Sequence, residues 1–236
     1  MKRVPGIFRI ACGLALGAAL AAPASGTILD RVPAKPDPGA RFLIYLHGRI
    51  VEEGGGRRPT SKEWGVYEYD QILEALAAGG ATVISEQRPA GTDVDKFAAH
   101  VADQVRLLLR SGVPPHRITV AGFSKGGSIA IRASALLRNP KVNFVFLAAC
   151  GNGDFKDLDL HVQGRLLSIY EANDEIGRSC NELFTKAGPT SERTEIEIPV
   201  GDHHGTFYRV HPEWVDPLRR WVESAPPDAR VAGEAR

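Results

Sequence analysis

The sequence predicts one α/β domain, built on a mostly parallel sheet of about six strands with helices on both faces. Short apolar runs alternate along the chain with longer segments whose apolar residues recur every three or four positions, as strands and crossover helices do. Several runs are continuously apolar, which favours strands buried on both faces of a parallel sheet. The chain has 236 residues, 43% of them hydrophobic, and a chain of this size can bury one large core.

The expected elements follow one another in strand–helix order from Arg41 onward. The first apolar run ends at His47, and a polar, glycine-rich loop over residues 49–62 separates it from a helix closed by two glycines. The last strand alternates in polarity and is ended by Pro199, which places it near a sheet edge. The expected strands cover residues 41–47, 81–85, 117–121, 142–149, 166–170 and 194–198, and the expected helices cover residues 67–78, 94–108, 128–137, 175–186 and 212–222.

The beginning of the chain has the pattern of a secretory signal peptide. Basic residues precede an apolar stretch over residues 10–22, and Ala22-Pro23-Ala24 is the small-x-small pattern that signal peptidases cleave. The stretch is too short and too rich in alanine and glycine for a good membrane span, and an anchor that is never cleaved is the alternative. We therefore expect a signal peptide at 1–24, an extended lead-in at 25–40, the folded domain at 41–223 and a flexible tail at 224–236.

Export would place the chain in an oxidising compartment, either the periplasm or the extracellular space. Cys150 and Cys180 both follow the signal segment, and an even pair in such a compartment predicts a disulfide, with two buried free thiols as the alternative. The formal net charge is +1 and no basic stripe stands out, so nucleic acid is not an expected partner. We expect no membrane span after cleavage, and the sequence does not determine the oligomeric state.

The segment Gly122-Phe123-Ser124-Lys125-Gly126 carries the strongest chemical signal in the chain. This G-x-S-x-G pattern stands directly between an expected strand and an expected helix, where a serine on a sharp turn presents its hydroxyl at the helix N-terminus. Side chains two positions before and after the serine would collide with such a turn, which accounts for the two glycines. Ser124 is therefore the expected nucleophile, and a glycine-rich turn with a capping serine is the alternative.

A serine nucleophile needs a base and a group that orients the base. The acid is expected after the strand at 166–170, where Asp174 is preferred because it lies beyond the strand end, at the sheet edge that carries active sites. Glu171 is the alternative if the strand runs further, and Glu175 is expected to be an N-terminal helix charge. Asp174 could also serve only as a helix cap.

The base is expected in the loop between the last strand and the last helix. His204 is preferred because the following Gly205 leaves the backbone free to turn the ring toward the serine, and His203 is the alternative. A metal site made from these histidines with Asp202 and His211 would lack a second cluster of closely spaced ligands, so no metal is expected.

Two backbone amides are expected to form an oxyanion hole, because acyl transfer needs donors for the oxygen that becomes negative. One is the amide of Lys125, directly after the nucleophile, and the other is the amide of Arg49 in the loop after the first strand. His47 is expected to brace that loop. Charged residues after strand ends are expected to line the mouth of the site, with ordinary surface salt bridges as the alternative: Arg49, Glu52, Glu53, Glu86 and Arg88.

These motifs, taken in chain order, resemble those of the α/β-hydrolase superfamily over about Arg41 to Val222: Leu46-His47-Gly48, Gly122-x-Ser124-x-Gly126, Asp174 and His204-Gly205. The resemblance implies an α/β-hydrolase fold, a Ser–Asp–His triad and an acyl-enzyme mechanism. Little room precedes Arg41 for the first two strands of many members, so a reduced sheet is expected. No stretch between Val142 and Leu166 is long enough for a large lid, which favours an open site for a small or polymer-end ester.

The sequence thus predicts an exported serine hydrolase that cleaves a carboxylic ester or thioester and needs no cofactor. Three alternatives stay open: an amidase or peptidase with the same triad, acyl transfer to an acceptor other than water, and a non-catalytic binding protein on a hydrolase fold. If the two cysteines pair, their disulfide would hold the loop that carries Asp174.

Overall fold

The structure is a computed structural model that describes residues 26–54, 56–151, 155 and 159–224. The predicted signal peptide and nearly all of the predicted C-terminal tail lie outside the described residues. Within these ranges, no helix has the length and apolarity that crossing a membrane requires.

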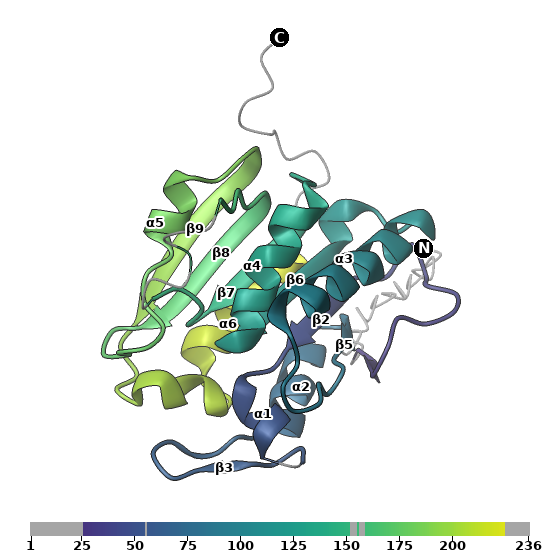
Figure 1. Ribbon diagram of the computed structural model, residues 1–236. Helices are drawn as coiled ribbons and strands as arrows, with labels where there is room; N and C mark the ends of the chain where they lie inside the picture. The colour runs from purple at the N-terminus through teal and green to yellow at the C-terminus, as the bar shows by residue number, and fades with distance from the viewer. Residues whose placement is uncertain (1–25, 55, 152–154, 156–158, 225–236) are drawn as a thin grey trace, which may run out of the picture.

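A seven-stranded, fully parallel sheet forms the centre of the described chain (Figure 1). Its strands are β1 (Ile28–Leu29), β2 (Phe42–Leu46), β5 (Thr82–Ile84), β6 (Ile118–Phe123), β7 (Asn143–Leu147), β8 (Gly164–Glu171) and β9 (Thr190–Ile198). They are arranged in the order β1-β5-β2-β6-β7-β8-β9. The predicted parallel sheet is confirmed, as is the edge position of the last strand. The sheet has one strand more than expected, because β1 is too short for its polarity pattern to be read within the predicted lead-in.

Helices cover both faces of the sheet (Figure 1). One face packs on α2 (Tyr69–Ala77) and α6 (Pro212–Glu223), and the other packs on α3 (Val94–Arg110), α4 (Lys125–Leu137) and α5 (Asn181–Thr185). Strand β2 is apolar throughout because both of its faces are buried. Leu43 and Tyr45 pack in the core beneath α2 and α6, whereas Phe42 and Ile44 pack in the core beneath α3, α4 and α5. Burial on two faces removes the alternation that a half-exposed strand would show.

Two local predictions were wrong. The loop expected at residues 49–62 contains a short helix, α1 (Arg49–Glu53), and the first strand of a hairpin formed by β3 (Thr60–Ser61) and β4 (Gly65–Val66). The helix expected at 175–186 is reduced to α5, and the residues before it form a turn in which the backbone amides of Ile176 and Gly177 donate to the carboxylate of Asp174. Two 3₁₀ helices, η1 (Pro115–Arg117) and η2 (His203–Tyr208), precede β6 and α6.

The parallel sheet brings its functional loops to one edge. Since the strands run in the same direction, the segments that follow β2, β5, β6, β8 and β9 all leave the sheet at its carboxyl end. Every residue preferred for the active site lies on one of these segments, and the alternative acid, Glu171, is the last residue of β8.

Candidate active site

Ser124 occupies a strained turn between β6 and α4. Its backbone angles are φ 54° and ψ −118°, a region that residues with a side chain rarely adopt and that costs about 1–3 kcal/mol. A Cβ on Gly122 would lie 2.1 Å from the carbonyl oxygen of Gly126, and a Cβ on Gly126 would lie 2.0 Å from that of Leu46. The turn therefore requires glycine on both sides of the serine, for the steric reason expected from the sequence.

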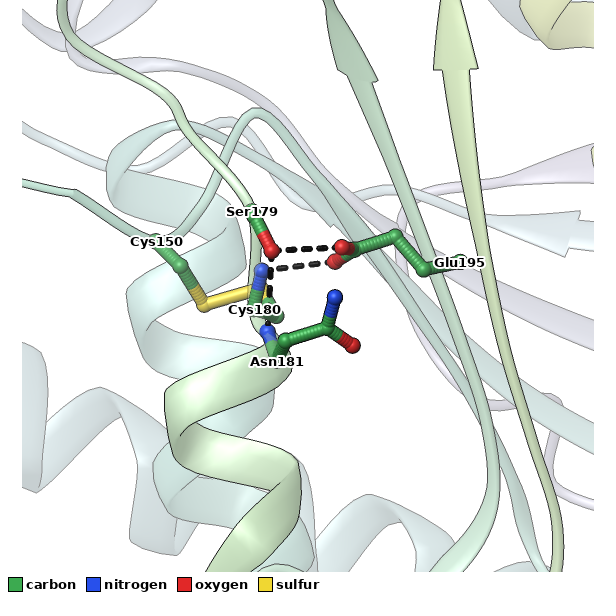
Figure 2. Close-up of a disulfide and its surroundings, with 5 residues drawn as sticks. All are labelled: Cys150, Ser179, Cys180, Asn181 and Glu195. Atoms are coloured by element: carbon green, nitrogen blue, oxygen red, sulfur yellow. Dashed lines mark hydrogen bonds between the residues drawn. A yellow bond between two sulfur atoms is a disulfide. The ribbon is translucent and has the colours of Figure 1, made fainter.

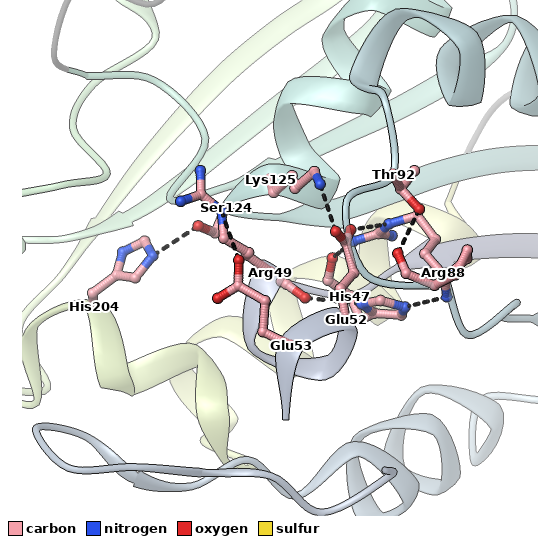
Figure 3. Close-up of polar contacts among 11 residues, drawn as sticks. His47, Arg49, Glu52, Glu53, Arg88, Thr92, Ser124, Lys125 and His204 are labelled. Atoms are coloured by element: carbon pink, nitrogen blue, oxygen red, sulfur yellow. Dashed lines mark hydrogen bonds and ion pairs between the residues drawn. The ribbon is translucent and has the colours of Figure 1, made fainter. Parts of the chain in front are cut away.

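Three side chains from separate loops form a continuous hydrogen-bonded series. The Oγ of Ser124 lies 2.9 Å from the Nε2 of His204, and the Nδ1 of His204 lies 2.7 Å from the Oδ2 of Asp174 (Figure 3 draws the serine and histidine). Because an ionised carboxylate only accepts hydrogen bonds, the partner set assigns the imidazole proton to Nδ1 and leaves Nε2 as the acceptor of the serine proton. The structure therefore brings together the preferred serine, acid and histidine of the sequence analysis.

Asp174 is held in place as a buried carboxylate. Its side chain is fully buried, and its Oδ1 accepts hydrogen bonds from the amides of Ile176 at 2.8 Å and Gly177 at 2.9 Å. Burial raises the pKa of this carboxyl, but the hydrogen bond and charge of His204, together with the two amides, outweigh burial and leave the pKa below its ordinary value. The group is thus arranged to stay ionised beside the imidazole.

The two alternative residues, Glu171 and His203, serve as braces in the same loops. The buried carboxylate of Glu171 accepts hydrogen bonds from the amides of Asn173 at 2.8 Å and Gly201 at 3.0 Å, so it joins the acid loop to the base loop. His203 has a positive φ of 50°, and its exposed ring contacts the carbonyl oxygen of Asn173 at 2.8 Å. Neither side chain takes part in the hydrogen bonds that join Ser124 to His204 and Asp174.

Aromatic rings surround the imidazole of His204. The ring of Phe123 lies 4.8 Å from it and that of Trp64 lies 5.2 Å from it, measured between centroids. A Cβ on Gly205 would lie 2.8 Å from the Cβ of Trp64, so this glycine makes room for the tryptophan. Gly205 has no positive φ, so the need for glycine here is space for Trp64 and not the backbone freedom expected from the sequence. Sequence reasoning missed Trp64, which lies between the expected loop at 49–62 and the expected helix at 67–78 and belongs to no motif.

The amides of Lys125 and Arg49 have no acceptor within their own helices. Each residue is the first of its helix, α4 or α1, and the first amides of a helix lack an intrahelical partner. The orientation of the Arg49 amide follows from His47, whose Nδ1 lies 2.9 Å from the carbonyl oxygen of Gly48. In a trans peptide the N–H points opposite to the C=O, so the Arg49 N–H points away from the His47 ring. The expected bracing role of His47 agrees with these contacts.

The imidazole of His47 is neutral, and its Nε2 accepts a hydrogen bond. The amide of Arg88 donates to its Nε2 at 2.9 Å, which leaves the proton on Nδ1. Burial, reinforced by the nearby guanidinium of Arg88, lowers the pKa of His47 to about 3. The imidazole consequently stays uncharged and keeps its donor toward Gly48 throughout the neutral range.

A buried ion cluster made of Glu52, Arg88 and Lys125 lies beside this loop (Figure 3). The Glu52 carboxylate receives the Nε of Arg88 at 2.7 Å and the Nζ of Lys125 at 2.5 Å, and only 1% of its side chain is exposed. The expectation that Glu52 and Arg88 line the entrance of the active site was wrong, because both side chains are buried. Each neutralises the charge of the other, which makes their burial possible. Glu86 instead forms a surface ion pair with His100 at 2.9 Å.

A cleft of about 500 Å³ opens beside the serine. Arg49 and Glu53 line it, as expected, together with the amide-bearing start of α4. Its walls combine aromatic side chains near His204 with small residues after β7: Trp64, Phe123, Tyr208, Ala148, Ala149 and Gly151. The cleft therefore offers a mixed apolar and charged surface next to the Ser124 hydroxyl.

The disulfide expected from the sequence is present between Cys150 and Cys180, which are 30 positions apart (Figure 2). Cys150 follows β7 and also pairs through its backbone with Arg178, so the bridge joins the cleft wall at Gly151 to the segment after Asp174. On the other side, the Glu195 carboxylate accepts hydrogen bonds from Ser179 and from the amide of Cys180. The acid loop is thus fixed to both neighbouring strands.

No metal cluster accompanies these histidines in the part of the chain that the structure describes, where no group of three or more potential ligands is arranged to hold an ion. Asp202, considered above as a ligand, lies 3.7 Å from a guanidinium nitrogen of Arg209 and 3.6 Å from the Nε2 of His211.

Comparison with curated proteins finds two partial relatives, and no family model matches the chain. An allantoinase of Bacillus licheniformis is 28% identical over 211 residues, which cover 80% of this chain and 41% of that protein. An acetyl-hydrolase of Streptomyces hygroscopicus is 35% identical over 124 residues, which cover 50% of this chain and 36% of that protein. The chain spans less than half the length of either relative.

Comparison with solved structures shows the fold. The crystal structure of SOBER1 from Arabidopsis thaliana superposes with a TM-score of 0.54 at 13% identity, over 79% of this chain and 99% of that one. A Klebsiella pneumoniae protein assigned as a dienelactone hydrolase superposes with a TM-score of 0.53 at 17% identity, over 81% of this chain and 90% of that one. Together with the parallel sheet, these likenesses show that the chain has the α/β-hydrolase fold.

Proposed function

We propose that this chain is an exported serine hydrolase that cleaves a carboxylic ester or thioester through an acyl-enzyme. Ser124 is the nucleophile, His204 the general base and then the general acid, and Asp174 the group that orients the imidazole. The observation that carries the proposal is the hydrogen-bonded series from the Ser124 hydroxyl through His204 to a buried carboxylate, at 2.9 and 2.7 Å.

In the first step, the Nε2 of His204 takes the hydroxyl proton while the Ser124 oxygen bonds to the carbonyl carbon of the substrate. The imidazolium that forms is stabilised by Asp174, whose carboxylate is already ionised and accepts the Nδ1–H. The bond to the leaving alcohol or thiol then breaks, and the leaving group takes the proton from Nε2. Water repeats the sequence on the acyl-enzyme and releases the acid.

The tetrahedral intermediate carries its negative charge on the former carbonyl oxygen. We assign its stabilisation to the amides of Lys125 and Arg49, which stand at the N-termini of α4 and α1, and α4, with 13 residues, adds the positive end of its helix dipole. Removing one such donor in a serine hydrolase typically lowers turnover by about 10²–10³-fold.

The cleft supports a small acyl group. Its volume of about 500 Å³ lies in the lower half of the range typical of ligand sites, and it opens directly beside Ser124. The likeness to a protein named acetyl-hydrolase favours the same choice. The charged rim of Arg49 and Glu53 suits a polar ester, or the end of a polymer, better than a long alkyl chain.

Export is supported by two features that are independent of the active site. The N-terminal segment has the composition of a signal peptide, and the Cys150–Cys180 disulfide suits an oxidising compartment.

A substrate panel tests the hydrolytic function directly. Short and long acyl esters, thioesters and amides are offered to the wild type and to Ser124→Ala, and we expect turnover of short esters that falls by several orders of magnitude in the variant. In parallel, a fluorophosphonate probe should label Ser124 of the folded protein. Equal rates in both proteins, together with no adduct on Ser124, would show a binding protein on a hydrolase fold. A preference for amides, or acyl products formed with added alcohols, would identify one of the other two alternatives.

A further inference from the structure

The buried ion cluster connects three loops that the sheet places side by side. Glu52 lies in α1 after β2, Arg88 follows β5, and Lys125 opens α4 after β6, and these strands are neighbours in the order β5-β2-β6. The Glu52 carboxylate binds both cations, with Arg88 fully buried and 13% of the Lys125 side chain exposed. Figure 3 shows the carboxylate between the two cations, beside the loop of His47.

One cation, Lys125, lies on a segment that carries a proposed oxyanion donor, and the other, Arg88, contacts the loop that carries the second donor. Lys125 supplies one donor through its own amide, so an ion pair on its side chain also restrains that amide. Arg88 reaches the other donor through His47, because its amide donates to the imidazole and its Nη2 donates to the His47 carbonyl. Since His47 in turn fixes the Gly48 carbonyl, Arg88 helps set the direction of the Arg49 N–H.

We propose that Glu52 is a positioning residue for the oxyanion hole: its carboxylate ties the loop that carries the Arg49 amide to the turn that carries the Lys125 amide. This inference rests on the proposed hydrolytic function and deepens it. Without the carboxylate, two cations would face each other in a buried site, and Lys125, the partly exposed one, would turn toward water. The separation and direction of the two amides would then no longer be held.

The test compares hydrolysis of an aryl acetate with that of the matching aryl thionoacetate, in which sulfur replaces the carbonyl oxygen. Amides positioned for an oxyanion favour oxygen over the larger, more weakly accepting sulfur, so the ratio of the two kcat values reports on the oxyanion hole. For Glu52→Gln we expect kcat for the acetate to fall about 10- to 100-fold with a small change in KM, and kcat for the thionoacetate to fall much less.

Two further variants keep the test informative. Lys125→Met breaks the same tie from the other side while it leaves the Glu52–Arg88 pair intact, and it should shift the kcat ratio in the same direction even if Glu52→Gln does not fold. Glu192→Gln is the matched control, because it removes a carboxylate of β9, at the far edge of the sheet, that binds Arg165 of β8 at 2.6 Å, and it should leave the kcat ratio at its wild-type value.

Each outcome has a distinct meaning. A ratio that stays at the wild-type value in folded Glu52→Gln or Lys125→Met, or equal losses with both substrates, would overturn the positioning role while esterase activity stands. A wild type no faster than Ser124→Ala on the acetate would instead refute the proposed function, and the positioning role with it.

Discussion

Replacing Cys150 and Cys180 by serine removes the bridge that links the cleft wall to the acid loop. The bridge spans 30 positions, and closing a loop of that length lowers the entropy of the unfolded chain by an amount equivalent to about 3.6 kcal/mol at 25 °C. For a domain of this size, such a loss lowers the Tm by about 7–14 °C. Since Gly151 lines the cleft and residues 176–178 follow Asp174, activity should be lost at a correspondingly lower temperature.

The assay is thermal unfolding and initial-rate esterolysis of the wild type and the double variant, each with and without a reductant that reaches buried disulfides. Reduced wild type should match the double variant, and the reductant should leave the double variant unchanged. Equal Tm values in all four samples, within about 2 °C, would refute both the entropic reasoning and the role of the bridge in holding the acid loop.

Two other expectations concern the site and its support. Asp174→Asn should keep the fold and lower kcat by about 10⁴-fold, because an amide can hold His204 in the wrong tautomer; a loss below about 10-fold would contradict the orienting role. His47 has a pKa of about 3 in the folded protein, below its ordinary value. As the pH falls from about 6.5 toward 3, its imidazole therefore binds a proton in the unfolded chain but not in the folded chain. As the pH falls through that window, this group should therefore lower the free energy of unfolding by about 1.4 kcal/mol per pH unit. Urea titrations at several pH values should show that the free energy of unfolding depends more steeply on pH in the wild type than in His47→Gln. Identical slopes in the two proteins would contradict a buried neutral imidazole.

Local pattern was enough to predict most of the architecture. A strand such as β2 is apolar at every position because both of its faces are covered, and a helix such as α3 carries its apolar residues at helical spacing because one face is covered. The short α1 escaped prediction because it depends on contacts with other loops rather than on its own periodicity.

The tertiary structure was needed to choose between residues that are close together in the sequence. Asp174 and Glu171 lie three positions apart at the end of the same strand, and His203 and His204 are adjacent, so spacing alone kept both pairs open. The backbone separates the histidines, since His203 takes a positive φ that leaves its ring exposed, whereas His204 is buried against Phe123.

By itself, the sequence determined the order of strands and helices and the glycine-flanked turn of Ser124. Burial of a face sets the spacing of apolar residues along one element, and close backbone contact in a turn requires glycine within two positions of the serine, so both leave a local pattern in the sequence. Only the tertiary structure decided which carboxylate meets which imidazole, and that Glu52 and Arg88 are buried. A charge in a protein interior is stable only with its partner, and these partners lie 36 positions apart in the chain.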